Sequence, residues 1–158
     1  MSTDMTSDVH EQPAAEPVGP VAKPFRYERP TLDGKPKAIK LLARSDRAFC
    51  AVQVIGRGGE NNLHSHAHVD GFWFVLSGRA RFYTTDDELV ADCGPGEGLM
   101  IPRGYPYWFE SSSPEELEIL QFEASDTRLG GPNDDRIDHT PRKPWMTPAP
   151  VGGTSGGA

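Results

Sequence analysis

Short apolar segments that recur between turn-forming residues are the feature that most constrains how this chain can fold. Alternating or continuous apolar residues predict strands at 38–43, 48–55, 72–76, 80–84, 89–93, 99–102, 105–110 and 117–124. The chain has 17 glycines and 15 prolines among 158 residues, and this content favours short strands and tight turns over long helices. Many short strands at close spacing are typical of a closed or sandwiched all-β barrel, and a small barrel can hold a narrow pocket at its mouth.

Composition divides the chain into one core and two polar ends. Residues 1–24 are polar, contain four prolines and show no periodicity, so we expect a disordered N-terminal tail. Residues 25–128 are predicted to form a single barrel with an N-terminal arm. Residues 129–158 are predicted to form an irregular C-terminal arm that ends in a flexible Gly-rich tail.

Charge and hydropathy exclude several classes of function. The formal net charge is −7, which argues against a protein that binds the phosphate backbone of nucleic acid. No apolar run reaches the roughly 18 residues that a membrane span needs, so no membrane partner is expected. The first residues carry acids and lack an apolar core, and two cysteines are too few for a disulfide framework. We therefore expect a cytoplasmic protein.

Three histidines alternate with other residues and are followed by a carboxylate at the same spacing: His64, His66, His68 and Asp70. Residues two apart on a strand face the same side, so His64 and His66 would present two imidazoles to one cavity. Imidazole is a common ligand of transition metals, and a carboxylate would complete a two-histidine, one-carboxylate face. A surface cluster of histidines is the alternative interpretation of the same pattern.

At this point the chain resembles the cupin family, over residues 31–125. The first family motif is G(X)5HXH(X)3–4E(X)6G and the second is G(X)5PXG(X)2H(X)3N. The matching positions are Gly58, His64, His66, Gly78, Gly96, Pro102 and Gly104. The resemblance implies an all-β fold, the double-stranded β-helix or jelly-roll barrel, with a pocket at its mouth. It also implies a homodimer in which residues 25–30 pair with the other subunit.

The chain departs from the family pattern at two expected ligands. The family glutamate falls on Asp70 or on Gly71, depending on the spacing, and the family histidine falls on Tyr107. The resemblance therefore carries over His64 and His66 as metal ligands, with Asp70 as the third. Tyr107 could ligate iron as a phenolate, hydrogen-bond a substrate, or mark a barrel without metal. His68 could be a spare ligand or proton shuttle, or an exposed histidine on a turn.

Alternation also predicts which aromatic residues face the pocket. Trp73 shares a face with Gly71, and Phe109 shares a face with Tyr107. We expect Trp73, Phe109 and Gln121 to contact a small substrate, the first two by stacking. The alternative is that the aromatic rings only fill the interior of the barrel.

These residues support three hypotheses for function. The first is a metal-dependent enzyme that uses Fe, Mn, Ni, Cu or Zn on a small organic molecule, with oxygenase-type chemistry and Tyr107 as acid, base or fourth ligand. The second is a non-catalytic small-molecule-binding or accessory protein. The third is a metal-free isomerase or epimerase, in which His66 or His68 forms a proton-transfer pair with Tyr107.

Overall fold

The chain folds almost entirely into β-strands in the computed structural model, which describes residues 19–131 and 133–146. The predicted Gly-rich tail, and the predicted disordered tail up to residue 18, lie outside the described residues. The elements are β1 (Lys37–Arg44), β2 (Ala48–Ile55), β3 (His64–His66), β4 (Val69–Ser77), β5 (Ala80–Tyr83), η1 (Thr85–Asp87), β6 (Leu89–Cys93), β7 (Gly98–Ile101), β8 (Trp108–Ser111), β9 (Leu117–Ser125), β10 (Arg136–Asp138) and η2 (Pro144–Met146).

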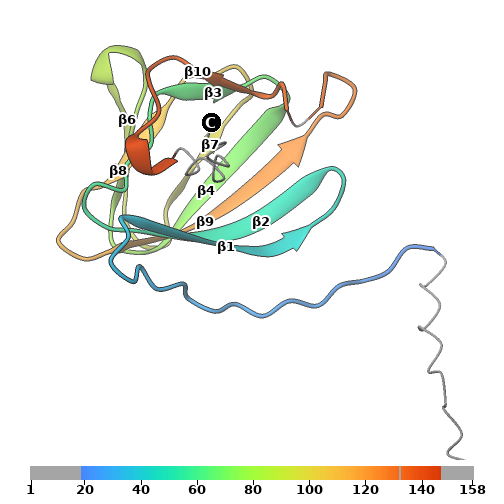
Figure 1. Ribbon diagram of the computed structural model, residues 1–158, viewed down its shortest axis with the longest axis horizontal. Coiled ribbons are helices and arrows are strands. Elements are labelled where there is room, and N and C mark those ends of the chain that lie inside the picture. The colour runs from blue at the N-terminus through green and yellow to red at the C-terminus, as the bar shows by residue number, and fades with distance from the viewer. Residues whose placement is uncertain (1–18, 132, 147–158) are drawn as a thin grey trace, which may run out of the picture.

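The strands form three antiparallel sheets that surround one interior (Figure 1). The largest sheet has the strand order β1-β2-β9-β4-β7, a second has the order β6-β5-β8, and β10 pairs with β3 in a third. A backbone bridge between His64 and Tyr107 links β3 to the segment that precedes β8. The all-β barrel expected from the sequence is confirmed.

The predicted strands agree with the observed ones, with differences mainly at their ends. The boundaries of β2 are those predicted, and β4 is longer than predicted at both ends. The segment predicted as a strand at 105–110 becomes a strand only from Trp108, at β8. His64 and His66 lie on a strand as expected, β3, whereas its partner β10 lies in a segment that was predicted to be irregular.

Alternation along the strands separates an inner face from an outer face. In β4, Gly71, Trp73 and Val75 are buried, whereas Phe72 and Phe74 are exposed. Tyr107 and Phe109 are buried in the same way on the opposite side of the barrel. These positions confirm the faces that the sequence predicted for both segments.

Aromatic rings fill the closed end of the barrel. The ring of Phe109 stacks on Phe82 with centroids 5.2 Å apart and contacts Trp73 at 4.7 Å. Phe82 and Phe109 are both at most 1% exposed. Aliphatic side chains from three other strands complete this core cluster, among them Ile55, Val75, Leu117 and Ile119.

Cys50 and Cys93 are free and buried, as the sequence predicted for small core residues. Burial raises the pKa of both thiols above the ordinary value. None of the helices in the part of the chain that the structure describes is long and apolar enough to cross a membrane.

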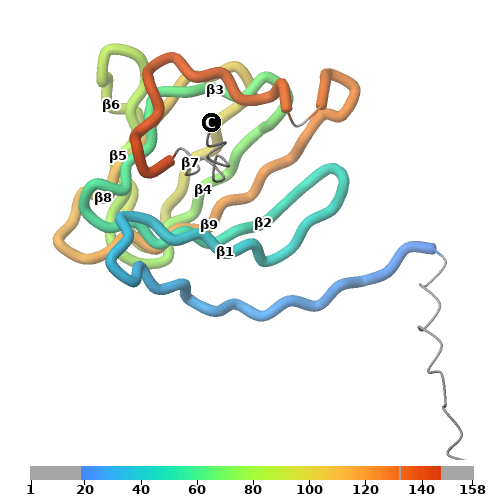
Figure 2. Tube along the Cα trace, viewed as in Figure 1, coloured from blue at the N-terminus to red at the C-terminus, as the bar shows by residue number. Residues whose placement is uncertain are grey.

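The N-terminal arm, residues 19–36, runs along the outside of the large sheet without regular secondary structure (Figure 2). Arg29 donates hydrogen bonds to Glu116 and Glu118 at 2.8 Å, and this attaches the end of the arm to its own barrel. Phe25 and Tyr27 remain exposed further out along the arm.

Candidate functional site

A cavity of about 450 Å³ lies inside the barrel, between the inner face of the large sheet and the pair β3 and β10. Side chains from both walls line it, and they include the buried polar residues Gln53, Asn61 and His64. Those relevant to chemistry are Lys37, His64, His66, Tyr107, Glu123 and Arg136. Among the residues that the sequence predicted as substrate contacts, Trp73 and Gln121 line this cavity.

His64 is held as a neutral imidazole with one defined tautomer. Its Nδ1 donates a hydrogen bond of 2.7 Å to the carbonyl oxygen of Asn62, so Nδ1 carries the proton and Nε2 has a free lone pair. Burial, together with the nearby charge of Arg136, lowers the pKa of His64 to about 3. Its ring therefore stays uncharged at neutral pH.

His66 lies one pleat further along β3, with its ring centroid 5.1 Å from that of His64. Its Nδ1 donates to Oδ2 of Asp135 at 2.6 Å, while Oδ1 of Asp135 accepts from the backbone N–H of His68 at 2.8 Å. Asp135 precedes β10 directly and is itself buried. This carboxylate fixes the tautomer of His66 and leaves its Nε2 available in the cavity.

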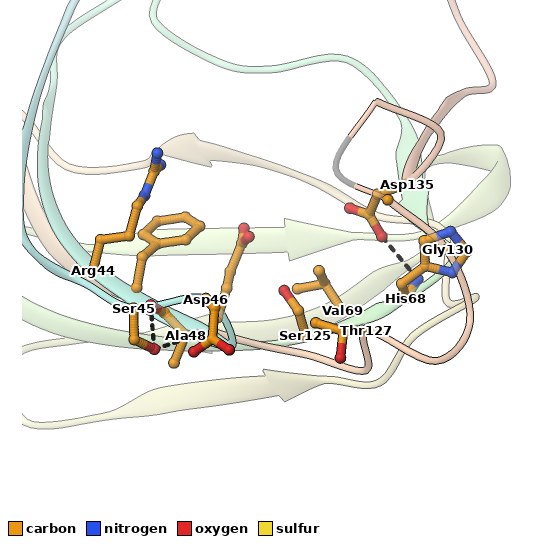
Figure 3. A pocket seen from close by; sticks show the side chains of 13 residues that line it. Arg44, Ser45, Asp46, Ala48, His68, Val69, Ser125, Thr127, Gly130 and Asp135 are labelled. Atoms are coloured by element: carbon orange, nitrogen blue, oxygen red, sulfur yellow. Dashed lines mark hydrogen bonds between the residues drawn. The ribbon is translucent and has the colours of Figure 1, made fainter. Parts of the chain in front are cut away.

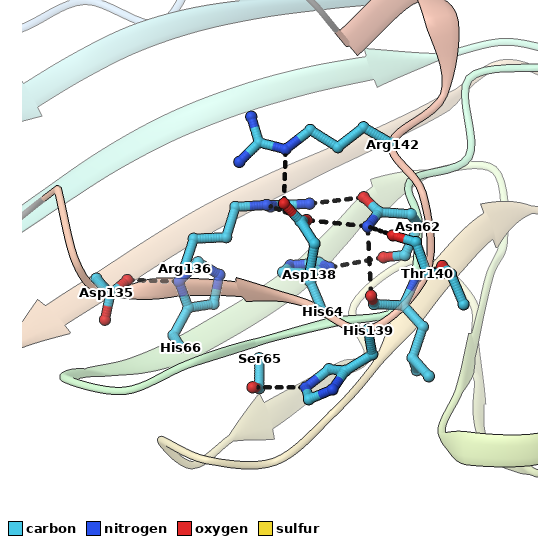
Figure 4. A network of polar contacts seen from close by, with 11 residues as sticks. Asn62, His64, Ser65, His66, Asp135, Arg136, Asp138, His139, Thr140 and Arg142 are labelled. Carbon is cyan, nitrogen blue, oxygen red and sulfur yellow. Dashed lines mark hydrogen bonds and ion pairs between the residues drawn. The ribbon is translucent and has the colours of Figure 1, made fainter.

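A polar network holds the C-terminal arm against β3 (Figure 4). Arg136 donates to Asn62 and Asp138, at 2.8 and 2.9 Å, and Asn62 donates to Asp138 at 2.9 Å. Arg142 also donates to Asp138, at 2.8 Å. These contacts place Asp135 beside His66, so a segment predicted as an irregular arm supplies part of the site.

Tyr107 and Glu123 complete the lining around the histidines: Tyr107 pairs with His64 through the backbone, and Glu123 belongs to β9 of the large sheet. The ring of Tyr107 lies 4.6 Å from that of His64, and burial together with the charge of Glu123 raises the pKa of its phenol well above the ordinary value. Burial also raises the pKa of Glu123, whose Oε1 accepts a hydrogen bond of 2.5 Å from Gln121. Both side chains border a small void beside Gly71 and His66.

The structure corrects the prediction that Asp70 completes a metal site. Asp70 belongs to the outer side of β4, where its Oδ1 accepts a hydrogen bond of 2.8 Å from the backbone N–H of Arg103. Gly71 takes the inner position instead. A one-residue change of register reverses the face of a strand residue, and this is why the spacing alone misplaced the carboxylate.

His68 and Phe109 do not line the cavity that holds the two histidines. His68 lies on the turn between β3 and β4 and lines a separate cavity of about 410 Å³ with Arg44 and Gly130 (Figure 3). Phe109 faces the interior as predicted, and it packs against the rings of Phe82 and Trp73, which agrees with the alternative that aromatic rings fill the barrel.

The described residues do not show a complete metal centre. Two imidazoles with engaged Nδ1 atoms are arranged as metal-ligating histidines are. However, residues 19–131 and 133–146 contain no group of three His, Cys, Asp or Glu side chains placed to hold an ion. The ammonium of Lys37 lines the same cavity and would oppose the binding of a divalent cation.

Comparison with known proteins identifies the fold. The family model described as "Cupin domain" matches residues 51–122. No curated protein matches the chain significantly.

Three solved structures illustrate the likeness. A Klebsiella pneumoniae protein with a double-stranded β-helix domain is 20% identical, with a TM-score of 0.54, and the match covers 63% of this chain and 84% of that one. An RmlC-like cupin from Methanocaldococcus jannaschii is 17% identical, with a TM-score of 0.55 and coverage of 70% and 96%. KdgF from Halomonas sp. is 16% identical, with a TM-score of 0.50 and coverage of 68% and 93%. At these identities the likeness shows the fold alone, the double-stranded β-helix predicted from the sequence.

Proposed function

This chain belongs to the cupin family, and from that premise we propose that it binds a small organic molecule in the barrel cavity and moves a proton on it without a metal, as an isomerase or epimerase does. One observation carries the proposal. His66, supported by Asp135 at 2.6 Å, and the buried phenol of Tyr107 line the same cavity. A supported imidazole and a neutral phenol form a base and acid pair.

His66 is the base in this proposal. Its Nε2 takes a proton from a carbon next to a carbonyl or carboxyl group, and the electron pair of the C–H bond moves onto the substrate. The carboxylate of Asp135 stabilises the imidazolium that forms and keeps the ring in position. The Nε2 of His64, which stays neutral, accepts a hydrogen bond from the substrate and orients it.

Tyr107 is the acid. Its phenol proton passes to the substrate at a different position from the one that His66 deprotonates, and solvent restores the proton of Tyr107 as His66 releases its own. Burial raises the pKa of Tyr107, so the phenol carries this proton throughout the physiological range. Because the two groups gain and lose one proton each, the reaction is a redistribution of hydrogen within the substrate.

Exchange with deuterated water tests the proposal. Small organic acids and carbonyl compounds that stabilise the protein in a thermal-shift screen are incubated with it in D2O, and NMR follows loss of the C–H signal. We expect the wild type to catalyse exchange. In His66→Gln and in Tyr107→Phe the exchange rate should be lower by a factor of about 100 or more. Tyr83→Phe, at a half-buried tyrosine on β5 that donates to Glu110, is the matched control. Compounds that bind without exchange would instead favour the non-catalytic hypothesis.

The metal-dependent function is the second candidate. It is favoured by the two imidazoles of His64 and His66, each with Nδ1 engaged. Oxygenase-type chemistry would need further metal ligands, which the described residues do not bring to these histidines. We therefore place this function after the metal-free one, and the metal content of the protein decides between them.

We also propose that the protein is a homodimer. Phe72, Phe74, Met100 and Phe122 are exposed on neighbouring strands on the outer face of the large sheet. Exposed apolar patches of this kind mark interaction surfaces. The extended arm carries exposed apolar side chains of its own, at Phe25 and Tyr27, so the arm of one copy and the sheet of another can cover each other.

The double variant Phe72→Ser, Phe122→Ser is expected to be a monomer, because these two side chains are cross-strand neighbours on this face. Sedimentation velocity measures the change from a dimeric wild type. Leu89→Ser, at an exposed position on β6, should leave the dimer intact. A wild-type protein that sediments as a monomer would refute the assembly.

A further inference from the structure

Lys37 enters the cavity from the large sheet. It is the first residue of β1 and pairs with Ile55, which belongs to the core, so its side chain lies on the inner side of the barrel. The ammonium nitrogen lies 5.7 Å from the ring centroid of Phe109 and 5.6 Å from that of Trp145. The two rings hold the cation in place but do not neutralise it.

No acidic side chain pairs with this cation. Within the described residues Lys37 has no salt bridge within 4 Å, whereas Lys40 on the same strand pairs with Glu28. A partly buried charge without a partner is costly, because burial removes its hydration. Unpaired cations in a cavity are therefore candidates for contact with a charged ligand.

The other charged groups that line the cavity have partners within the protein. Arg136 is paired with Asp138 at 2.9 Å, and Glu123, the single acidic residue among the lining side chains, accepts a hydrogen bond from Gln121. Lys37 is thus the lining cation that has no acidic partner among the described residues, and a bound anion would balance its charge.

We propose that Lys37 binds the carboxylate of a small, planar organic acid in the barrel cavity. One ammonium without an acidic partner matches one negative charge, and the aromatic side chains among the lining residues match a flat molecule. The inference names the ligand class of the proposed function and rests on it for the location of the site. It places the acid group at the β1 wall of the cavity, whereas the two histidines belong to β3.

Matched acids and amides test the proposal. Benzoate and phenylpyruvate, with benzamide and phenylpyruvamide as their uncharged counterparts, are titrated into the full chain by calorimetry. We expect each acid to bind more tightly than its amide, and Lys37→Met to weaken the acids about 10- to 100-fold while leaving the amides unchanged. Lys40→Met, which removes a surface ion pair on the same strand, is the control and should have no effect on binding.

The result is decisive in both directions. Circular dichroism verifies that Lys37→Met is folded, and Lys37→Gln replaces it if it is not. Equal affinity of acids and amides in the wild type, or unchanged acid binding in a folded variant at Lys37, would overturn the proposal. Acid binding that depends on Lys37 but occurs without deuterium exchange would retain this inference and reject the proposed proton transfer.

The pH dependence of benzoate binding gives a further check. Burial, with the neighbouring charge of Arg136, lowers the pKa of Lys37 to about 8. Only the protonated amine attracts the carboxylate, so the affinity should decrease about tenfold per pH unit above that value. This dependence should disappear in Lys37→Met, although the other groups that face the cavity are retained: His64, His66, Tyr107, Glu123 and Arg136.

Discussion

The double variant Gly71→Glu, Tyr107→His is expected to bind Zn(II) several orders of magnitude more tightly than the wild-type protein. Both substitutions place metal-binding side chains beside His64 and His66, at positions where the cupin pattern has ligands. A Cβ at Gly71 would meet no heavy atom closer than 3.9 Å, and the residue faces the void next to His66. Four donors around one point provide the coordination that the wild-type residues lack.

Isothermal titration calorimetry with Zn(II) measures the gain. Asp70→Glu is the matched control. It places a glutamate next to position 71 but on the outer side of β4, so it should not change the affinity for Zn(II). Wild-type protein that already binds Zn(II) as tightly as the double variant would contradict our account. A folded double variant whose Zn(II) affinity equals that of the wild type would also contradict it.

Phe109→Ala is expected to lower the free energy of unfolding by about 3–5 kcal/mol, since it leaves a cavity in a closed core. Phe109 is 1% exposed and stacks on Phe82, and its ring also contacts Trp73. Urea denaturation followed by tryptophan fluorescence measures the change. Leu89→Ala, which removes an exposed side chain from β6, should have a much smaller effect.

The same variant separates the two roles that the sequence left open for Phe109. If it is a core residue, the loss is in stability. If it is a substrate contact, Phe109→Ala would remain close to wild-type stability and lose ligand affinity instead. The second outcome would mean that the cavity extends further into the barrel than the structure shows.

Local patterns predicted the barrel and its inner face correctly. Period-two alternation in 72–76 placed Trp73 inside and Phe72 outside, as observed. The close spacing of His64 and His66 predicted that both rings would share one cavity, and they do. These predictions succeed because the direction of a side chain on a strand depends on its immediate neighbours.

The rest of the site depends on contacts between distant segments, which no local pattern records. Asp135 reaches His66 only because β10 pairs with β3, and these strands lie about 70 residues apart in the chain. Glu123 reaches the void at Gly71 because the two residues are paired across β9 and β4. Asp70 was misassigned for a related reason, since the register of β4 decides which of two adjacent residues points inward.

Sequence reasoning also gave no sign of Lys37. A single lysine at the start of a strand is ordinarily a solvated residue, and only the pairing of β1 with β2 directs it inward. The final strand offered one usable signal, because Glu123 alternates with Gln121 and therefore shares its face. The alternation rule that placed Gln121 in the predicted pocket would therefore have placed the carboxylate of Glu123 there as well.

Metal analysis of the native protein tests whether it acts without a metal. The protein is purified without an affinity tag or a chelator, and inductively coupled plasma mass spectrometry counts Fe, Mn, Ni, Cu and Zn per chain. Our account predicts that none of these is present in stoichiometric amount, and that the wild type still exchanges substrate hydrogen with solvent. One equivalent of a transition metal in the wild type, lost in His64→Ala and in His66→Ala, would contradict it.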